Sequence, residues 1–165
     1  GDGLACHGGH FDKGSYMCEE VLRIPFAMKW KGVIPAGQVR DELISTIDFP
    51  VTLLDAAGMK FTRNQVDGQS ILPLVTGKPV KWREDLMSET QGHGYGEDVM
   101  ARVIRYKNWK YVITKDDLEE LYDLEKDVFE LHNLAENSEF QNVLEDMRAR
   151  LAKWQRETGD PFKMR

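Results

Sequence analysis

The sequence predicts a mixed α/β fold that ends in a small antiparallel sheet covered by a C-terminal helix. Three observations carry this prediction. A glycine-rich polar loop runs into an apolar segment within residues 1–26, and two strand-like runs, 101–106 and 109–114, are separated by only two residues. Near the C-terminus, apolar residues recur at steps of three and four over residues 140–154, which is typical of an amphipathic helix.

The first half of the chain predicts one strand and one longer helix. Residues 21–30 contain few polar side chains and suit a buried strand. Apolar residues then recur at helical spacing over residues 43–57, after a possible cap at Asp41, and Gly58 suits the end of that helix. Pro50 lies inside this pattern, so we expect either a kink or a helix that begins later.

A short helix and a boundary between two parts follow. Residues 70–75 predict the helix, which Gly77 would close. The segment 76–85 is polar and contains a proline, so we place the boundary near its middle. The predicted parts are an α/β portion, residues 1–80, and a small α+β portion, residues 81–165.

Three strand-like runs open the second part. They cover residues 101–106, 109–114 and 119–124, and the middle run is rich in aromatic and β-branched residues. Only Lys107 and Asn108 separate the first two runs, which predicts a tight hairpin. The acidic run from Asp116 to Glu130 lacks the spacing of an EF-hand, so we expect a solvated face.

The last predicted element is the amphipathic helix. Asn137 or Ser138 can cap its beginning. Basic residues gather toward its end, where the helix dipole favours positive charge: Arg148, Arg150, Lys153 and Arg156.

Composition excludes several classes of function. The chain has 165 residues, 41% hydrophobic and 30% charged, which are values of a globular protein. Its net charge of −6 argues against nucleic acid as the main partner. No apolar run approaches the roughly 20 residues that span a bilayer. Cys6 and Cys18 could pair or bind a metal with neighbouring histidines, although their spacing matches no standard zinc motif, and the simplest interpretation is two ordinary thiols.

The N-terminal loop is the first candidate site. Asp2, His7, His10, Asp12 and Lys13 stand among five glycines at the edge of the predicted strand. Glycine permits sharp turns close to a ligand, and α/β enzymes tend to keep ionisable groups on such loops.

Four stretches together resemble the C-terminal part of a sulfatase of the alkaline-phosphatase superfamily. The family has a glycine-rich loop leading to Lys-Gly, Glu and Arg-x-Pro, a Leu-Leu-Asp-x-Ala-Gly helix end, a Gly-x-Ser-Leu-x-Pro-Leu element, and a closing hairpin followed by Glu-Leu-Tyr-Asp-Leu and Asn-Leu-Ala. The matching segments here are residues 1–26, 31–58, 67–77 and 101–135. The resemblance implies the C-terminal piece of an alkaline-phosphatase-like sandwich, followed by the small sheet and its helix.

The resemblance also implies chemistry. Family members hydrolyse sulfate esters with a formylglycine, made from Cys or Ser, beside one divalent metal ion, usually Ca²⁺. Gly1 corresponds to the position just after an Asp-His or Asp-Asn pair of metal ligands, and the formylglycine motif, Cys or Ser-x-Pro-x-Arg, should lie much further upstream. The chain contains neither form of that motif. We therefore expect no metal ligand in this chain, no activity from it alone, and a partner in the N-terminal part of the same protein.

Five residues are candidates for contact with the substrate. The resemblance matches Lys13 to the lysine that contacts the sulfate, against the alternative of a surface lysine. It matches His7 to a loop histidine that could protonate the leaving group, against a histidine bonded to backbone. His10 has no clear counterpart in the family and is a weaker candidate. His93 and Tyr95, on a second glycine-rich loop, are candidate substrate contacts, although a plain solvated loop fits them as well.

The sequence thus predicts a sulfatase that acts on a sulfated small molecule or glycan. Two alternatives stay open. One is a phosphonate monoester or phosphodiester hydrolase of the same superfamily, and the other is a noncatalytic relative that binds anions or glycans. By family analogy alone, the compartment would be periplasmic, secreted or lysosomal.

Overall fold

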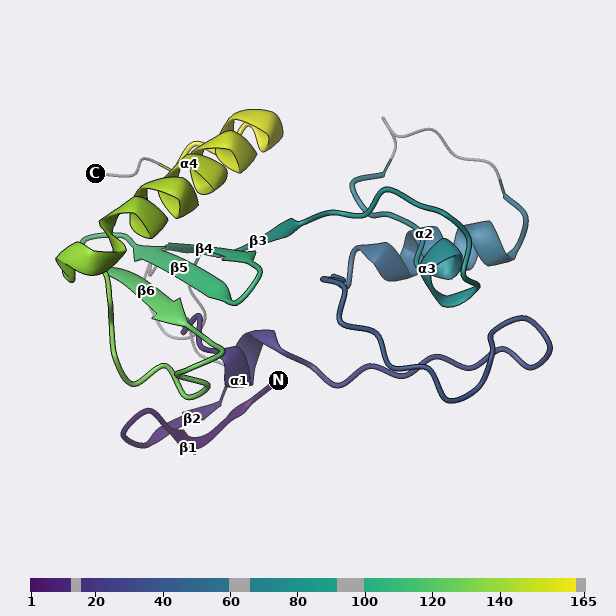
Figure 1. The fold of residues 1–165 in the computed structure, drawn as a ribbon, viewed down its shortest axis with the longest axis horizontal. Coiled ribbons are helices and arrows are strands. Elements are labelled where there is room, and N and C mark those ends of the chain that lie inside the picture. Colours follow the sequence, from purple (N-terminus) through teal and green to yellow (C-terminus); the bar gives the residue numbers. More distant parts are fainter. Residues whose placement is uncertain (13–15, 60–65, 92–99, 163–165) are drawn as a thin grey trace. The chain divides into compact units, whose positions relative to one another are not determined.

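The computed structural model describes residues 1–12, 16–59, 66–91 and 100–162 (Figure 1). The chain divides into two compact units. One consists of Gly1–Pro25 together with Met87–Arg165, and the other of Phe26–Leu86. The division near residue 80 that the sequence suggests stays a prediction. The fold is mixed α/β with a four-stranded antiparallel sheet and a C-terminal helix, as predicted. Among the described residues, no helix combines the length and apolarity needed to cross a membrane.

The larger unit holds the sheet, a separate N-terminal hairpin and the long helix. Its elements, in chain order, are β1 (Gly3–Cys6), β2 (His10–Asp12), α1 (Glu19–Leu22), β3 (Asp85–Thr90, which begins at the unit boundary), β4 (Ala101–Tyr106), β5 (Trp109–Thr114), β6 (Glu119–Asp123), the 3-10 turn η2 (Ser138–Phe140) and α4 (Gln141–Thr158).

The four-stranded sheet has the order β3-β4-β5-β6. Strands β4 and β5 pair without a slip, from Ala101 opposite Thr114 to Tyr106 opposite Trp109, so the predicted hairpin is confirmed. Lys107, in its two-residue turn, has a φ of 54°, the left-handed conformation that tight hairpins require.

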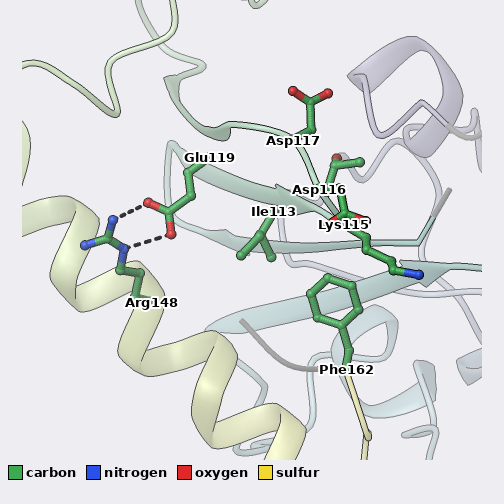
Figure 2. Close-up of a pocket in the computed structure, with 8 residues that line it drawn as sticks. Ile113, Lys115, Asp116, Asp117, Glu119, Arg148 and Phe162 are labelled. Atoms are coloured by element: carbon green, nitrogen blue, oxygen red, sulfur yellow. Dashed lines mark hydrogen bonds and ion pairs between the residues drawn. The ribbon is translucent and has the colours of Figure 1, made fainter. Parts of the chain in front are cut away.

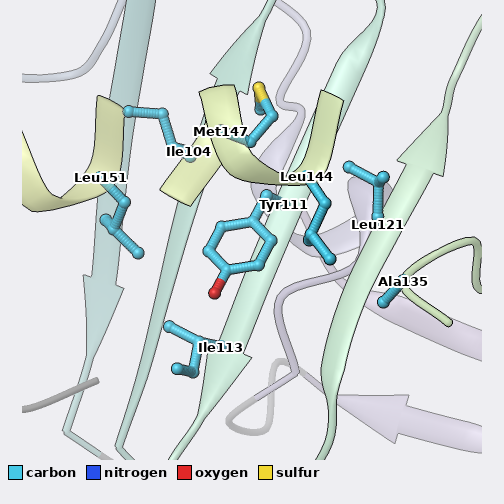
Figure 3. Packing of buried hydrophobic residues seen from close by; sticks show 8 residues of the cluster. All are labelled: Ile104, Tyr111, Ile113, Leu121, Ala135, Leu144, Met147 and Leu151. Carbon is cyan, nitrogen blue, oxygen red and sulfur yellow. The ribbon is translucent and has the colours of Figure 1, made fainter. Parts of the chain in front are cut away.

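Both faces of the sheet are covered, because successive side chains of a strand point to opposite faces. On one face, Ile104, Tyr111 and Leu121 pack against Leu144, Met147 and Leu151 of α4, as Figure 3 shows. On the other face, Val103 and Val112 pack with Met17 and Leu22, which flank and end α1. This double burial explains why consecutive residues of one strand, such as Val103 and Ile104 of β4, are both apolar.

The boundaries of α4 have local causes. The Asn137 side chain accepts a hydrogen bond from the backbone N–H of Glu139 at 3.0 Å and so caps the turn that leads into the helix, one of the two predicted caps. Gly159 ends the helix with a φ of 70°, and its N–H donates to the Gln155 carbonyl.

The smaller unit contains α2 (Asp48–Ala56) and α3 (Leu72–Val75). Helix α2 begins seven residues after the predicted cap at Asp41, with Pro50 in its first turn, where a missing N–H costs nothing. The later beginning, one of the two expectations that Pro50 raised, is therefore correct. Gly58 ends the helix with a φ of 71°.

The buried strand predicted over residues 21–30 is wrong. Residues 19–22 form α1 instead, and residues 23–30 are in neither a helix nor a strand. Ile24 and Phe26 are each 44% exposed. A strand needs a neighbour to hydrogen-bond with, and no described segment pairs with this one. Apolar composition alone could not reveal that.

Candidate functional site

The N-terminal hairpin places His7 at its turn. Strands β1 and β2 pair antiparallel, with Cys6 opposite His10, and the Gly9 N–H donates to the Cys6 carbonyl at 3.0 Å. His7 has a φ of 45°, and Gly8 and Gly9 have φ values of 82° and 110°. Three successive residues with positive φ make a very tight turn. The last two are glycines, which adopt positive φ at little cost.

The His7 imidazole is held by a carboxylate from α1. Its Nε2 lies 3.2 Å from Glu20 Oε2, in a part-buried contact. Burial would raise the pKa of Glu20, but hydrogen bonds from its own N–H, from His7 and from the Cys18 thiol, with the charge of His7, outweigh burial and lower it. The backbone nitrogen of Gly1 also donates to the Val21 carbonyl at 2.7 Å. The hairpin is therefore fastened to α1 by a backbone contact and a side-chain contact.

Helix α1 is in turn fastened to the sheet by charges. The Glu19 N–H donates to Glu130 Oε2 at 2.7 Å, and Arg105 Nη1 lies 2.8 Å from Glu19 Oε2. Lys110 Nζ, fully buried, lies 2.5 Å from Glu130 Oε1 and 3.5 Å from Glu19 Oε1. Two cations from β4 and β5 thus balance two carboxylates, as buried charges require. This network positions the loop that contains His7.

A pair of thiols lies beside the same contacts. The potential metal-binding atoms of Cys6, Cys18 and Glu20 lie within 4.8 Å of one another. Neither cysteine forms a disulfide. Burial raises the pKa of the Cys18 thiol to about 11. A second group joins His7, Glu20 and Glu130. Neither group offers the six to eight oxygen ligands that Ca²⁺ takes, so these residues do not suit Ca²⁺. That the Ca²⁺ ligands precede Gly1 stays a prediction.

An open pocket of about 430 Å³ lies at the turn between β5 and β6 (Figure 2). Asp116 and Lys115 of the turn line it, together with Glu119 and Arg148, whose side chains make a two-pronged ion pair. Burial alone would raise the pKa of the Glu119 carboxyl. The Arg148 guanidinium and the hydrogen bond from Tyr111 outweigh burial and lower it. This cation and this carboxylate satisfy each other.

Of the five predicted site residues, His7 is the one whose side chain the structure describes. The backbone of His10 lies in β2, and its side chain is outside the described set. Lys13, His93 and Tyr95 also lie outside the described residues. The roles predicted for all five therefore stay predictions.

Sequence reasoning missed the residues that hold the loop. The acidic segment was expected to be a solvated face, yet Asp123 is 4% exposed and Glu130 is 6% exposed. The sequence signals for this network were Arg105 and Lys110, charged residues within strand patterns that are otherwise mostly apolar. A lysine there needs a buried carboxylate, but nothing in the pattern says which one.

Comparison with known proteins decides the family. Residues 6–157 match the family described as N-sulphoglucosamine sulphohydrolase, C-terminal. The chain belongs to this sulfatase family. The match covers the thiol pair, the α1 segment and the whole sheet, and so confirms the resemblance on which the sequence interpretation rested.

Individual sulfatases are similar over most of the chain. An ulvan-active sulfatase of Formosa agariphila is 29% identical over 183 residues, which cover 92% of this chain and 36% of that protein. A choline-sulfatase of Rhizobium meliloti is 34% identical over 150 residues, 86% of this chain and 28% of that protein. The chain thus spans about a third of the length of these relatives.

Solved structures confirm the fold. A putative sulfatase from Bacteroides thetaiotaomicron superposes with a TM-score of 0.64 at 29% identity, covering 68% of this chain and 25% of that one. The phosphonate monoester hydrolase of Agrobacterium radiobacter gives a TM-score of 0.62 at 25% identity, covering 72% of this chain and 26% of that one. The sulfatase-family chain therefore has the predicted alkaline-phosphatase-like architecture of such enzymes.

Proposed function

We propose that the protein containing this chain is a sulfatase that hydrolyses sulfate esters of carbohydrates. The observation that carries the proposal is the family match over residues 6–157, which includes the turn and second strand of the N-terminal hairpin and the closing sheet. The preference for carbohydrate is supported by the names of relatives, among them an ulvan-active sulfatase and a Bacteroides thetaiotaomicron N-acetylglucosamine-6-O-sulfatase.

In this proposal, the chain supplies groups that handle charge and protons. The Lys13 ammonium contacts the sulfate oxygens, where negative charge gathers as the sulfur–oxygen bond breaks. His7, as imidazolium, gives a proton to the leaving alkoxide, and Glu20 holds the ring in place at 3.2 Å. The nucleophilic formylglycine and the Ca²⁺ ligands are proposed to lie upstream of Gly1, so this chain alone would be inactive.

The test of Lys13 uses the protein with its N-terminal part. We expect Lys13→Ala to lower kcat/KM for a sulfated monosaccharide by about 100-fold or more, the cost of losing one donor that stabilises a developing oxyanion. The matched control is Lys153→Ala, a lysine 60% exposed on α4, which should keep activity within about twofold. Unchanged turnover in Lys13→Ala would remove the role proposed for Lys13.

The test of His7 depends on the leaving group. A general acid matters for a sugar alkoxide, which leaves poorly, and matters little for p-nitrophenolate, which leaves without a proton. His7→Gln should therefore slow hydrolysis of a sugar sulfate by about 100-fold while p-nitrophenyl sulfate is hydrolysed nearly as before. An equal loss on both substrates would mean that His7 acts on binding or structure instead.

A second candidate function is hydrolysis of phosphonate monoesters, which the likeness to the Agrobacterium radiobacter enzyme supports. The two functions can be distinguished by comparing kcat/KM for p-nitrophenyl sulfate and p-nitrophenyl phenylphosphonate in the same preparation. A higher value for the phosphonate would favour the second candidate. Binding of sulfated glycan without turnover of either ester would favour a noncatalytic relative.

A further inference from the structure

A cluster of sulfur and oxygen ligands lies where the N-terminal hairpin meets α1. Cys6 ends β1, Cys18 is the residue before α1, and Glu20 lies in the first turn of that helix. All three side chains are partly buried, and their ligand atoms lie within 4.8 Å of one another. Two segments separated by eleven residues of chain thus bring together two thiols and a carboxylate.

We propose that Cys6, Cys18 and Glu20 bind a zinc ion, with His7 holding the Glu20 carboxylate from the second coordination shell. Thiolate sulfur, imidazole nitrogen and carboxylate oxygen are the ligands that zinc takes in proteins. Sulfur ligands do not suit the Ca²⁺ proposed for the catalytic centre, so this would be a different site for a different metal.

The spacing fits a tetrahedral ion after a small closure. With zinc–sulfur bonds of about 2.3 Å, two sulfur ligands of one zinc lie about 3.8 Å apart. Ligand atoms within 4.8 Å of one another need to approach by about 1 Å at most. A side-chain rotation at Cys6 or Glu20 can provide that movement. Since the cluster is only partly buried, a water molecule can take the fourth position.

Binding of zinc changes the protonation of the two thiols. In the metal-free protein, the Cys18 thiol donates a hydrogen bond to the Glu20 carboxylate. On binding zinc, each thiol releases its proton to solvent and its sulfur forms a bond to the metal.

The His7–Glu20 contact is of the kind that orients metal ligands, because a carboxylate that binds zinc usually accepts a hydrogen bond from a neighbouring residue. Nε2 of His7 lies 3.2 Å from Oε2 of Glu20, so the imidazole can orient a carboxylate whose oxygen binds metal. Partners of this kind typically contribute 10- to 100-fold to metal affinity. A zinc ion here would tie the hairpin to α1, which lie on either side of the segment that contains Lys13.

The test uses the reduced, metal-free protein with its N-terminal part and cobalt(II) as a spectroscopic substitute for zinc. Cobalt bound by thiolate gives a charge-transfer absorption in the near ultraviolet, and zinc should displace it. We expect this absorption in the wild-type protein and in the control Glu136→Gln, an exposed carboxylate on the loop before α4. Cys6→Ser and Cys18→Ser should abolish it, and His7→Ala should weaken zinc binding by about 10- to 100-fold.

Two results would overturn the proposal. One is no thiolate–cobalt absorption in the reduced wild-type protein, and the other is an absorption that survives the double change of Cys6 and Cys18 to Ser. A measurement on the unmodified protein covers the case in which the variants misfold. Zinc should slow alkylation of Cys6 and Cys18 by iodoacetamide, read by peptide mass spectrometry, and equal labelling with and without zinc would also reject the site.

Discussion

The ion pair between Arg102 and Asp160 offers a sharp test of how the end of α4 is held to the sheet. The Arg102 side chain is 2% exposed and that of Asp160 is 4% exposed. Two parallel hydrogen bonds of 2.7 Å join them, and Asp160 also accepts from the Phe162 N–H at 3.1 Å. The Arg102 guanidinium is the main cause that lowers the pKa of Asp160 from 3.8 to about 2.

Asp160→Asn keeps the shape of the side chain and removes its charge, which leaves the buried guanidinium with Glu89, 52% exposed and 3.4 Å away, as its remaining carboxylate partner. The fall in the pKa of Asp160 corresponds to about 2.5 kcal/mol. Breaking a buried pair typically costs about 3–5 kcal/mol. Because Asn still accepts one hydrogen bond, we expect a loss near 2.5–3 kcal/mol in the local free energy of unfolding.

Hydrogen exchange followed by mass spectrometry measures this loss in the intact protein. Amides of β4 and of the last turns of α4 should exchange roughly 70- to 160-fold faster in Asp160→Asn. Asp146→Asn is the matched control, since Asp146 is 51% exposed and pairs with Arg150 one turn along the same helix. That change should alter exchange by about twofold at most. Exchange in Asp160→Asn within twofold of wild type would refute the reasoning.

The same pair predicts a dependence on pH. The pKa of Asp160 is lower in the folded protein, so its contribution is complete above the ordinary value of 3.8 and is lost as the pH falls toward about 2. The difference in urea midpoint between wild type and Asp160→Asn should therefore be constant from pH 7 to about pH 5 and should shrink by pH 3. A difference that grows on acidification would contradict this assignment.

Three further changes test other parts of the fold. Asp48→Asn removes the buried counter-ion of Arg83, at 2.5 Å, and should speed exchange of α2 amides by about 100-fold, whereas exchange close to wild type would show that the pair contributes little. Gly159→Ala places a methyl group at a φ of 70° and should cost about 1 kcal/mol, seen as earlier thermal unfolding; an unchanged midpoint would argue against that conformation. Tyr111→Phe removes the hydroxyl that donates to Glu119 at 2.8 Å while keeping the buried ring, so a loss of about 1 kcal/mol in a urea titration is expected, and a loss above about 3 kcal/mol would mean that the ring itself repacks.

The sequence predicted those elements whose signal is local. Strands β4 and β5 have the expected bounds, because β-branched and aromatic residues and a two-residue turn all lie within one short segment. Helix α4 was equally predictable, since six apolar residues at helical spacing, a possible cap at Asn137 and basic residues toward its end agree with one another. Each of these elements carries its own evidence.

The rest depended on partners distant in sequence. Residues 21–30 have the composition of a strand but no strand to pair with among the described residues, so composition misled. The candidate site fared similarly. The loop could be found from its glycines and His7, whereas Glu20 and Glu130 are ordinary acidic residues until folding brings them to His7 and Lys110. The separation of Lys110 and Glu130 in the sequence does not indicate that their side chains form an ion pair.

The buried charges explain how the closing sheet positions the N-terminal hairpin, which contains the candidate site residue His7. A buried ion pair adds little net stability over apolar packing, but it strongly penalises any arrangement that separates its partners. Lys110 and Arg105 therefore fix where Glu19 lies, and with it α1, the Glu20–His7 contact and the hairpin. The same reasoning separates the lysines. The Lys110 ammonium is fully buried between carboxylates, so a sulfate cannot reach it, and Lys110 has a structural role rather than a substrate-binding one.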